Sequence, residues 1–295
     1  MRRQGVPSWL LLGLLLCAQL ATSVSAHAAP SRAEQFLPLP GGSFLRISAA
    51  DIAIGAPGQR WRSIPHPGIS YVTDAAADRE GVLVAGSVQT GARGEHPVIL
   101  LIGGDGQVLK QWQGQEGIAT SLASHGERRV VVVFDKLFSL AADGTLQRIA
   151  DVPFHAQILL TASGRLIVCV PNSRSAADFK APSCKALEEK PWHAEGAWSQ
   201  PPISCGAWII EAGAGGTLVR KSEDGQVVAR SSQTGRLFCR QGQELILLSS
   251  TVRAFSLPAL TPRTTRFCGS SKIIDLAVTA DAVVALLASG ALRRC

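Results

Sequence analysis

The residues best suited to bind a partner lie together in one stretch of the chain, residues 171–206. This stretch is polar and proline-containing, and it places tryptophans beside charged side chains. Such residues make binding hot spots when they are held in an ordered loop, because pre-ordering reduces the entropy lost on binding. The candidate binding residues are Lys185, Lys190, Trp192, His193 and Trp198. The alternative is that the tryptophans pack on the scaffold while the charges face water, and the sequence leaves both interpretations open.

A second possibility is acid–base chemistry at the centre of the ring of repeated β-sheet units that the repeats described below predict. The side chains that could supply it lie near the expected inner strands and are Asp74, Asp78, His125, His155 and Asp275. The histidines are isolated along the chain, and no Gly-x-Ser-x-Gly nucleophile elbow occurs. We therefore assign no catalytic residue and expect a non-catalytic binding protein. A secreted hydrolase or lyase with its site at a central channel is the alternative.

Motifs for metals and cofactors are missing from the sequence. Gly213, Gly215 and Gly216 lack the Gly-Lys-Ser/Thr ending of a phosphate-binding loop. Neither a calcium-binding loop nor a His-Glu-x-x-His zinc motif occurs. The sequence thus predicts no cofactor and no metal site.

The first 26 residues have the pattern of a cleaved signal peptide. Arg2 and Arg3 precede a short apolar stretch, and Val24-Ser25-Ala26 supplies the small-x-small cleavage pattern. We expect export to the periplasm or the medium, a short linker over residues 27–35 and no transmembrane segment. Leu16 stands where a lipoprotein has a small residue before its modified cysteine, which disfavours anchoring through Cys17.

Cysteine usage agrees with export, since removal of Cys17 leaves an even number. The remaining cysteines are Cys169, Cys184, Cys205, Cys239, Cys268 and Cys295. An even count in an exported chain suggests disulfides. Our preferred pair is Cys184 with Cys205, which would close the irregular stretch into a loop.

The charge pattern does not indicate a nucleic-acid-binding protein. The chain has 29 Lys and Arg against 22 Asp and Glu, a formal net charge of +7, but the basic residues are scattered. A nucleic-acid surface needs a basic patch, preferably with aromatic stacking platforms. We expect a monomer whose partner is an envelope or extracellular protein or a polysaccharide.

A long-range repeat indicates the architecture. Phe138-Ser139-Leu140 recurs as Phe255-Ser256-Leu257, 117 positions later, within similar surroundings. Read as three periods of about 39 residues, this separation is typical of β-propeller blades. Short runs rich in Val, Ile and Leu alternate with Gly, Asp and Pro turns, which is an all-β pattern.

The turns allow the repeats to be counted. Asp105-Gly106, Asp143-Gly144 and Asp224-Gly225 are hairpin turns, because glycine adopts the positive φ that a tight turn needs. The wide gap between the last two predicts one irregular unit, with residues 171–206 as an insertion or degenerate blade. We expect seven four-stranded blades over residues 36–295, with six as the alternative.

Two further expectations concern the edges of the repeats. The last unit looks short, so residues 36–39 are expected to supply its missing outer strand and thereby close the ring. Trp61 and Trp112 follow hairpin turns on outer strands, where we expect them to cover seams between repeats rather than to bind a ligand.

On the period, the Asp-Gly hairpins and the apolar strands, the chain resembles the β-propeller superfamily. It lacks the Gly-His and Trp-Asp marks of WD40 blades and the Ser-x-Asp-x-Gly-x-Thr-Trp box of sialidase-like propellers. The tryptophan-docking repeat of quinone-dependent dehydrogenases is also missing. Calcium-dependent lactonase-like propellers use asparagine ligands, and this chain has only Asn172. The resemblance implies a fold and assigns no specific family or activity.

Overall fold

The computed structural model describes residues 35–48, 51–66, 69–89, 94–171, 182–187, 191–194, 197–263, 268 and 272–295. The chain separates into two compact units, residues 1–31 and 32–295, and every described residue belongs to the second unit. The signal peptide expected over residues 1–26 and the candidate Lys190 lie outside the described residues.

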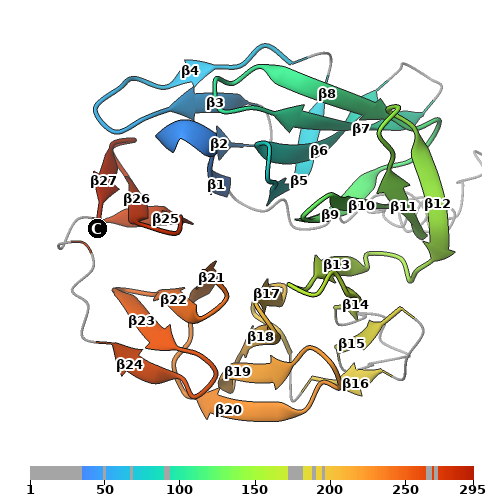
Figure 1. The fold of residues 1–295 in the computed structure, drawn as a ribbon. Helices are drawn as coiled ribbons and strands as arrows, with labels where there is room; N and C mark the ends of the chain where they lie inside the picture. Colours follow the sequence, from blue (N-terminus) through green and yellow to red (C-terminus); the bar gives the residue numbers. More distant parts are fainter. Residues whose placement is uncertain are drawn as a thin grey trace, which may run out of the picture. The chain divides into compact units, whose positions relative to one another are not determined.

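The described residues form antiparallel sheets, called blades below, arranged in a ring (Figure 1). Blade 1 contains β1 (Gln35–Pro38), β2 (Phe44–Ile47), β3 (Ile52–Gly55) and β4 (Arg62–Ser63), with a short 3-10 helix η1 (Pro40–Gly42). Blade 2 contains β5 (Tyr71–Ala77), β6 (Val82–Gln89), β7 (Glu95–Ile102) and β8 (Val108–Gln113). Blade 3 contains β9 (Ala119–His125), β10 (Arg128–Val133), β11 (Lys136–Leu140) and β12 (Leu146–Asp151).

The second half of the ring repeats this arrangement. Blade 4 contains β13 (Gln157–Leu160), β14 (Leu166–Val170), β15 (Ser183–Ala186) and β16 (Trp192–His193). Blade 5 contains β17 (Ile203–Cys205), β18 (Trp208–Gly213), β19 (Gly216–Lys221) and β20 (Val227–Ser231). Blade 6 contains β21 (Arg236–Arg240), β22 (Glu244–Leu248), β23 (Val252–Ser256) and β24 (Thr261–Arg263). Blade 7 contains β25 (Ile273–Val278), β26 (Val283–Leu287) and β27 (Leu292–Arg294).

Within each blade the strands pair in chain order, from the innermost strand to the outermost (Figure 1). Blades 1 to 6 each have four strands, and blade 7 has three among the described residues. The prediction of an all-β propeller with seven blades is therefore confirmed, and the six-bladed alternative is wrong.

The burial of each strand depends on its place in the blade. Middle strands such as β6 and β7 are buried almost continuously, because neighbouring blades cover both of their faces. Outer strands such as β8 and β20 alternate between more and less exposed side chains, because they lie at the rim. Continuous apolar runs and alternating runs thus reflect different positions in one repeated unit.

Every seam between neighbouring blades contains its own apolar cluster. Val82 and Val84 of β6 pack in the seam with blade 1, whereas Leu83 and Ala85 pack in the seam with blade 3. This division follows from the strand geometry, since successive side chains point to opposite faces of a sheet. The core of the protein is therefore a ring of seams rather than one central cluster.

The three predicted Asp-Gly turns all connect the third and fourth strands of a blade. The glycines have positive φ values of 82° at Gly106, 89° at Gly144 and 72° at Gly225. In each turn the aspartate accepts a hydrogen bond from the backbone N–H two residues later, over 2.9 Å. The local sequence signal and the observed turns agree because both arise from contacts within four residues.

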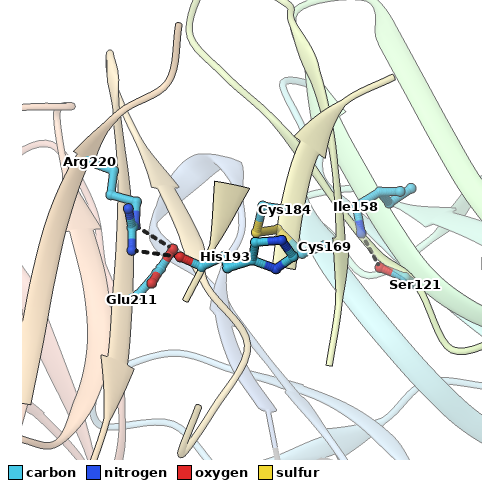
Figure 2. Close-up of a disulfide and its surroundings, with 7 residues drawn as sticks. All are labelled: Ser121, Ile158, Cys169, Cys184, His193, Glu211 and Arg220. Atoms are coloured by element: carbon cyan, nitrogen blue, oxygen red, sulfur yellow. Dashed lines mark hydrogen bonds and ion pairs between the residues drawn. A yellow bond between two sulfur atoms is a disulfide. The ribbon is translucent and has the colours of Figure 1, made fainter. Parts of the chain in front are cut away.

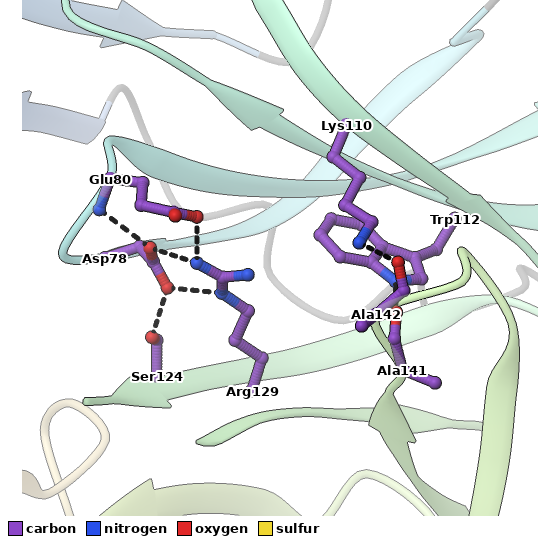
Figure 3. Close-up of polar contacts among 8 residues, drawn as sticks. All are labelled: Asp78, Glu80, Lys110, Trp112, Ser124, Arg129, Ala141 and Ala142. Atoms are coloured by element: carbon purple, nitrogen blue, oxygen red, sulfur yellow. Dashed lines mark hydrogen bonds and ion pairs between the residues drawn. The ribbon is translucent and has the colours of Figure 1, made fainter. Parts of the chain in front are cut away.

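Two tryptophans lie in seams as predicted. The Nε1–H of Trp61 in blade 1 donates to the carbonyl of Gly290 in blade 7 over 2.8 Å. The Nε1–H of Trp112 in blade 2 donates to the carbonyl of Ala141 in blade 3 over 2.7 Å (Figure 3). Each indole is thus satisfied within the protein and is not available to a ligand.

The expected closure of the ring by an N-terminal outer strand is wrong. Residues 35–38 form β1, the innermost strand of blade 1, and pair with β2. The N-terminal strand therefore completes its own blade, and blade 7 keeps the three strands it has in the described residues. The ring closes through contacts across the seam between blades 7 and 1. They include a 3.2 Å hydrogen bond from the backbone N–H of Phe36 to Oδ2 of Asp275.

The preferred disulfide between Cys184 and Cys205 is also wrong. The pairs are Cys169–Cys184, Cys205–Cys239 and Cys268–Cys295. Cys169 and Cys184 stand directly opposite each other on β14 and β15. Cys205 and Cys239 lie on the inner strands of blades 5 and 6, so their disulfide links two blades. The pairing follows strand register and blade order, neither of which a count of cysteines contains.

Candidate functional site

The stretch proposed from sequence as a binding segment builds the seam between blades 4 and 5. It supplies β15 and β16 of blade 4 and reaches β17 of blade 5. Trp198 forms an isolated antiparallel bridge with Gly213 at the end of β18. Trp192 and Trp198 both pack against the seam's apolar cluster, to which blade 5 contributes one buried residue, Ile209.

The structure does not bring all the predicted binding residues to this seam. Cys184 and Ala186 of β15 belong to the cluster between blades 4 and 5. Lys185 lies between them on the strand, so its side chain points to the opposite face, toward blade 3. His193 is exposed at the end of β16 and contributes its backbone carbonyl to the seam.

Trp192 joins the two blades by covering a turn of its neighbour. A Cβ built on Gly225, in the turn between β19 and β20, would lie 2.5 Å from the Trp192 indole. Glycine is therefore required here both by its positive φ of 72° and by the closeness of the ring. The Nε1–H of Trp192 is buried and has no hydrogen-bond partner among the described residues.

Arg220 of β19 also joins blades 4 and 5 through hydrogen bonds. Its Nη1 donates to the carbonyl of Gly225 over 2.9 Å, and its Nη2 donates to the carbonyl of His193 over 3.2 Å. Its Nε lies 2.9 Å from Oε1 of Glu211 (Figure 2). The side chains of Arg220 and Glu211 are only 6% and 2% exposed, so this is a buried ion pair beside the apolar cluster of the seam.

A small cavity opens beside this ion pair. Its volume is about 250 Å³, and Trp198, Glu211 and Gly213 line it together with Arg230 at an exposed edge. Oε2 of Glu211 and Nε1 of Trp198 are both buried without a hydrogen-bond partner among the described residues. Buried polar atoms are nearly always hydrogen-bonded in native proteins, so these two atoms are exceptions among the described residues.

Sequence reasoning found Trp198 but missed Glu211 and Arg220. A signal for both was present, because each is a charged residue inside an otherwise apolar strand, β18 and β19 respectively. Side chains of alternating strand residues face one seam, and Glu211 and Arg220 fall on the face toward blade 4. The sequence does not reveal that β18 and β19 pair so that Glu211 and Arg220 point to the same face of blade 5.

The residues considered for central acid–base chemistry have structural partners. Oδ2 of Asp74 on β5 accepts the backbone N–H of Leu122 on β9 over 2.9 Å, which links blades 2 and 3. Ser121 does the same for Ile158 over 3.1 Å, linking blades 3 and 4 (Figure 2). With Asp275 and Phe36, these bonds form a repeated latch between inner strands.

Asp78 is part of an ion-pair cluster between blades 2 and 3. Arg129 donates to both carboxylate oxygens of Asp78 over 2.8 Å, and Ser124 donates over 2.5 Å (Figure 3). Burial of the carboxyl raises its pKa, but the hydrogen bonds from Arg129 and Ser124 outweigh burial and lower the pKa of Asp78 below its ordinary 3.8. Glu80 extends the cluster with a 2.5 Å contact to Arg129.

The two histidines considered for a central catalytic site lie at opposite ends of their inner strands. His125 ends β9, whereas His155 precedes β13, the corresponding inner strand of the next blade. Because the blades repeat around the ring, these positions fall on opposite faces of it.

The described residues also contain no group of three His, Cys, Asp or Glu side chains placed to hold a metal ion. No helix in the described part of the chain has the length and apolar character needed to cross a membrane.

Comparison with known proteins gives the fold and no family. No family model matches the chain, and no curated protein matches it. Among solved structures 452 chains match, so the architecture is widely shared. One of them belongs to the structure described as "Crystal Structure of Mitotic Checkpoint Complex", with a TM-score of 0.58, 10% sequence identity, and coverage of 93% of this chain and 97% of that one. At this identity the likeness concerns the backbone alone, and it agrees with the seven-bladed β-propeller fold of the described residues.

Proposed function

We propose that this protein is an exported, non-catalytic β-propeller that binds an envelope or extracellular macromolecule through the seam between blades 4 and 5. The observation that carries the proposal is the cavity beside the Glu211–Arg220 pair, which Trp198 and the exposed residues Ala197 and Arg230 also line. The ion pair and the Trp192 contact to Gly225 keep this seam in one arrangement. A pre-ordered site loses little entropy when it binds.

Two observations support export. The chain begins with a signal-peptide pattern over residues 1–26, and three disulfides join its described cysteines. Disulfides persist in oxidising compartments and are rare in the cytosol. Periplasm and medium both meet this condition.

The seam is a better candidate than the centre of the ring. Asp74, Asp78 and Asp275 are all used in bonds between blades. Glu211, in contrast, is buried with one oxygen that no described residue binds. The seam also has a cavity whose lining includes exposed residues such as Ala197 and Arg230.

The proposal is tested by affinity capture with a matched pair of surface variants. Ala197 is exposed and lines the cavity, so Ala197→Arg fills its mouth without touching the ion pair. Leu109 is 55% exposed in blade 2, so Leu109→Arg makes the same kind of change far from the seam. Wild-type protein and both variants are immobilised and exposed to envelope extract and to concentrated medium of the producing cells.

We expect wild type and Leu109→Arg to retain the same component, and Ala197→Arg to lose it. Mass spectrometry and sugar analysis of the eluates measure the difference. Equal retention by all three proteins would contradict a site at this seam.

A further inference from the structure

The fold gathers the positive charge of the chain into one part of the ring. Residues 35–66 and 236–295, which build blades 1, 6 and 7, contain 11 Lys and Arg against 4 Asp and Glu. Residues 67–235, which build blades 2 to 5, contain 15 Lys and Arg against 17 Asp and Glu. Blade 7 adjoins both blade 6 and blade 1, so basic residues that look scattered in the sequence become neighbours in the structure (Figure 1).

The acidic residues of these three blades leave little negative charge at the surface. Asp275 and Glu244 are buried, and each lies within ion-pair distance of an arginine of the same blades. Asp51 is half-buried, which leaves Asp281 as the one exposed acid among the four. The solvent-facing charge of blades 6, 7 and 1 is therefore predominantly positive.

The exposed arginines of these blades follow the outer rim of the ring. The outermost described strands of blades 6, 7 and 1 are β24, β27 and β4. Trp61, directly before β4, donates to the carbonyl of Gly290 in the turn before β27, so blades 1 and 7 adjoin here. The arginines on or just before these strands form a group, called the arginine rim below, that consists of Arg60, Arg62, Arg263, Arg293 and Arg294.

Two of these arginines are held in place within the protein itself. Nε of Arg263 donates to Oγ of Ser256 over 2.7 Å, and Nη2 of Arg62 donates to the carbonyl of Asp105 over 3.1 Å. A guanidinium group presents a planar fork of donors that matches the oxygens of a carboxylate. Because a side chain that is already ordered loses less entropy on binding, the arginine rim suits a partner with repeated anionic groups.

The other side chains of these blades distinguish among polyanions. Single-stranded nucleic acid needs exposed aromatic rings on which its bases stack, and the exposed Phe134 and Phe154 lie outside blades 6, 7 and 1. An anionic membrane surface is bound by inserting apolar side chains, and the exposed Ile274 lies on the innermost strand β25 rather than on the rim.

The shape of the rim distinguishes the two remaining polymers. The outer strands lie along the circumference of the ring, so the arginine rim curves across three blades (Figure 1). Duplex DNA is stiff over about 50 nm and touches a convex surface at one place. A flexible chain of acidic sugars follows the curve and brings successive carboxylates to successive arginines.

We propose that the arginine rim of blades 6, 7 and 1 binds a linear acidic polysaccharide through ion pairs between its carboxylates and the guanidinium groups. This surface shares no residue with the seam between blades 4 and 5, so the inference goes beyond the proposed function. Ala197→Arg, which blocks that seam, leaves the arginine rim unchanged. The two proposals therefore stand or fail separately.

The test measures binding of the full protein, with its disulfides intact, to alginate, a linear chain of carboxylated sugars. Uncharged dextran, duplex DNA and vesicles of equal parts phosphatidylcholine and phosphatidylglycerol are the comparison ligands. A rim variant replaces one arginine of each blade through Arg60→Gln, Arg263→Gln and Arg294→Gln. A matched control removes the same charge from exposed positions of blades 2 and 3 through Arg79→Gln, Arg128→Gln and Arg148→Gln.

We expect wild type and the control variant to bind alginate equally, and the rim variant to bind about tenfold more weakly. Added salt should weaken binding by wild type, because it screens charges at the surface. Melting curves verify that each variant is folded. If the triple rim variant is unfolded, Arg60→Gln and Arg294→Gln are measured singly, and each should weaken binding about twofold.

Four outcomes would overturn the inference. Alginate fails to bind, dextran binds as tightly as alginate, or duplex DNA or the vesicles bind more tightly than alginate. The fourth is an equal loss of affinity in the rim variant and the control variant, which would assign the binding to the net charge of the chain rather than to the arginine rim.

Discussion

The phenol of Tyr71 shows how a single side chain reports on its surroundings. Tyr71 begins β5 in blade 2, and its hydroxyl donates to Oε2 of Glu95 over 2.7 Å. Burial, followed by the bond to Glu95, raises the pKa of Tyr71 from 10.0 to about 12. The chain has one tyrosine, so phenolate absorbance reads this group directly.

We expect the tyrosine absorbance of folded protein to titrate near pH 12, and that of unfolded protein near pH 10.0. The raised pKa stabilises the fold fully below pH 10.0, and this contribution is lost as the pH rises through about 12. Glu95→Gln should lower the folded pKa only partway, because burial remains. An unchanged pKa in this variant would contradict a role for Glu95.

The Asp78–Arg129 pair has the opposite pH dependence. The lowered pKa of Asp78 stabilises the fold above the ordinary value of 3.8, and the contribution is lost as the pH falls through the folded pKa. Arg129→Met should cost about 3 kcal/mol at neutral pH, because it leaves Asp78 buried without its cation. Urea unfolding at neutral and acidic pH measures this cost. The destabilisation should shrink at acidic pH, and an equal loss at both pH values would rule out the ionised pair as its cause.

Among the elements, the inner strands determine how neighbouring blades join. Asp74 on β5 and Asp275 on β25 play the same part, because each accepts a backbone N–H from the inner strand of the next blade. A carboxylate at this position accepts a hydrogen bond from a buried backbone N–H. It thereby fixes how far neighbouring inner strands can slide along each other. Side chains that looked suitable for catalysis are thus explained as latches.

The latch predicts a difference between two replacements of Asp275. Asp275→Asn keeps an acceptor for Phe36, whereas Asp275→Ala leaves that buried N–H without one. We expect the alanine variant to lose about 2 kcal/mol more unfolding free energy than the asparagine variant. Chemical denaturation followed by tryptophan fluorescence measures the difference. Equal losses would mean that the charge contact with Arg236, 3.1 Å away, matters more than the latch.

Features of the elements that arise locally could be predicted, and features that depend on pairing could not. The Asp-Gly turns and apolar strands give the seven blades, since each involves neighbours in the chain. The disulfide partner of Cys184 depends on the register of β14 with β15. The strand at residues 35–38 has the same local pattern whether it pairs in blade 1 or in blade 7. Glu211 and Arg220 become a site only when β18 and β19 face blade 4.

At the scale of the whole molecule, the disulfides are distributed unevenly. All three lie in blades 4 to 7, and Cys205–Cys239 is the one that links neighbouring inner strands. Blades 1 to 3 have noncovalent seams alone in the described residues. The ring is therefore braced on the side that carries the candidate site.

This distribution predicts unequal effects of removing individual disulfides. Cys205 and Cys239 are separated by 34 positions in the sequence, and Cys169 and Cys184 by 15. In the chain-entropy model their removal costs about 4 and about 3 kcal/mol. Replacing each pair by alanine and measuring thermal unfolding should show the larger loss for the pair between blades. A larger loss for Cys169–Cys184 would contradict the order expected from loop length.

In the described part of the chain no N-terminal strand joins blade 7, and this has a mechanical consequence. In a ring closed by a strand from each end of the chain, tension on both ends loads several backbone hydrogen bonds at once. Here β1 pairs with β2 alone, so tension on the N-terminal side peels β1 away and opens the ring between blades 7 and 1. The Cys268–Cys295 bond closes blade 7 into a covalent loop, so it resists from the other side. Under load the protein should unravel in one direction, from blade 1 onward, and extend further after reduction.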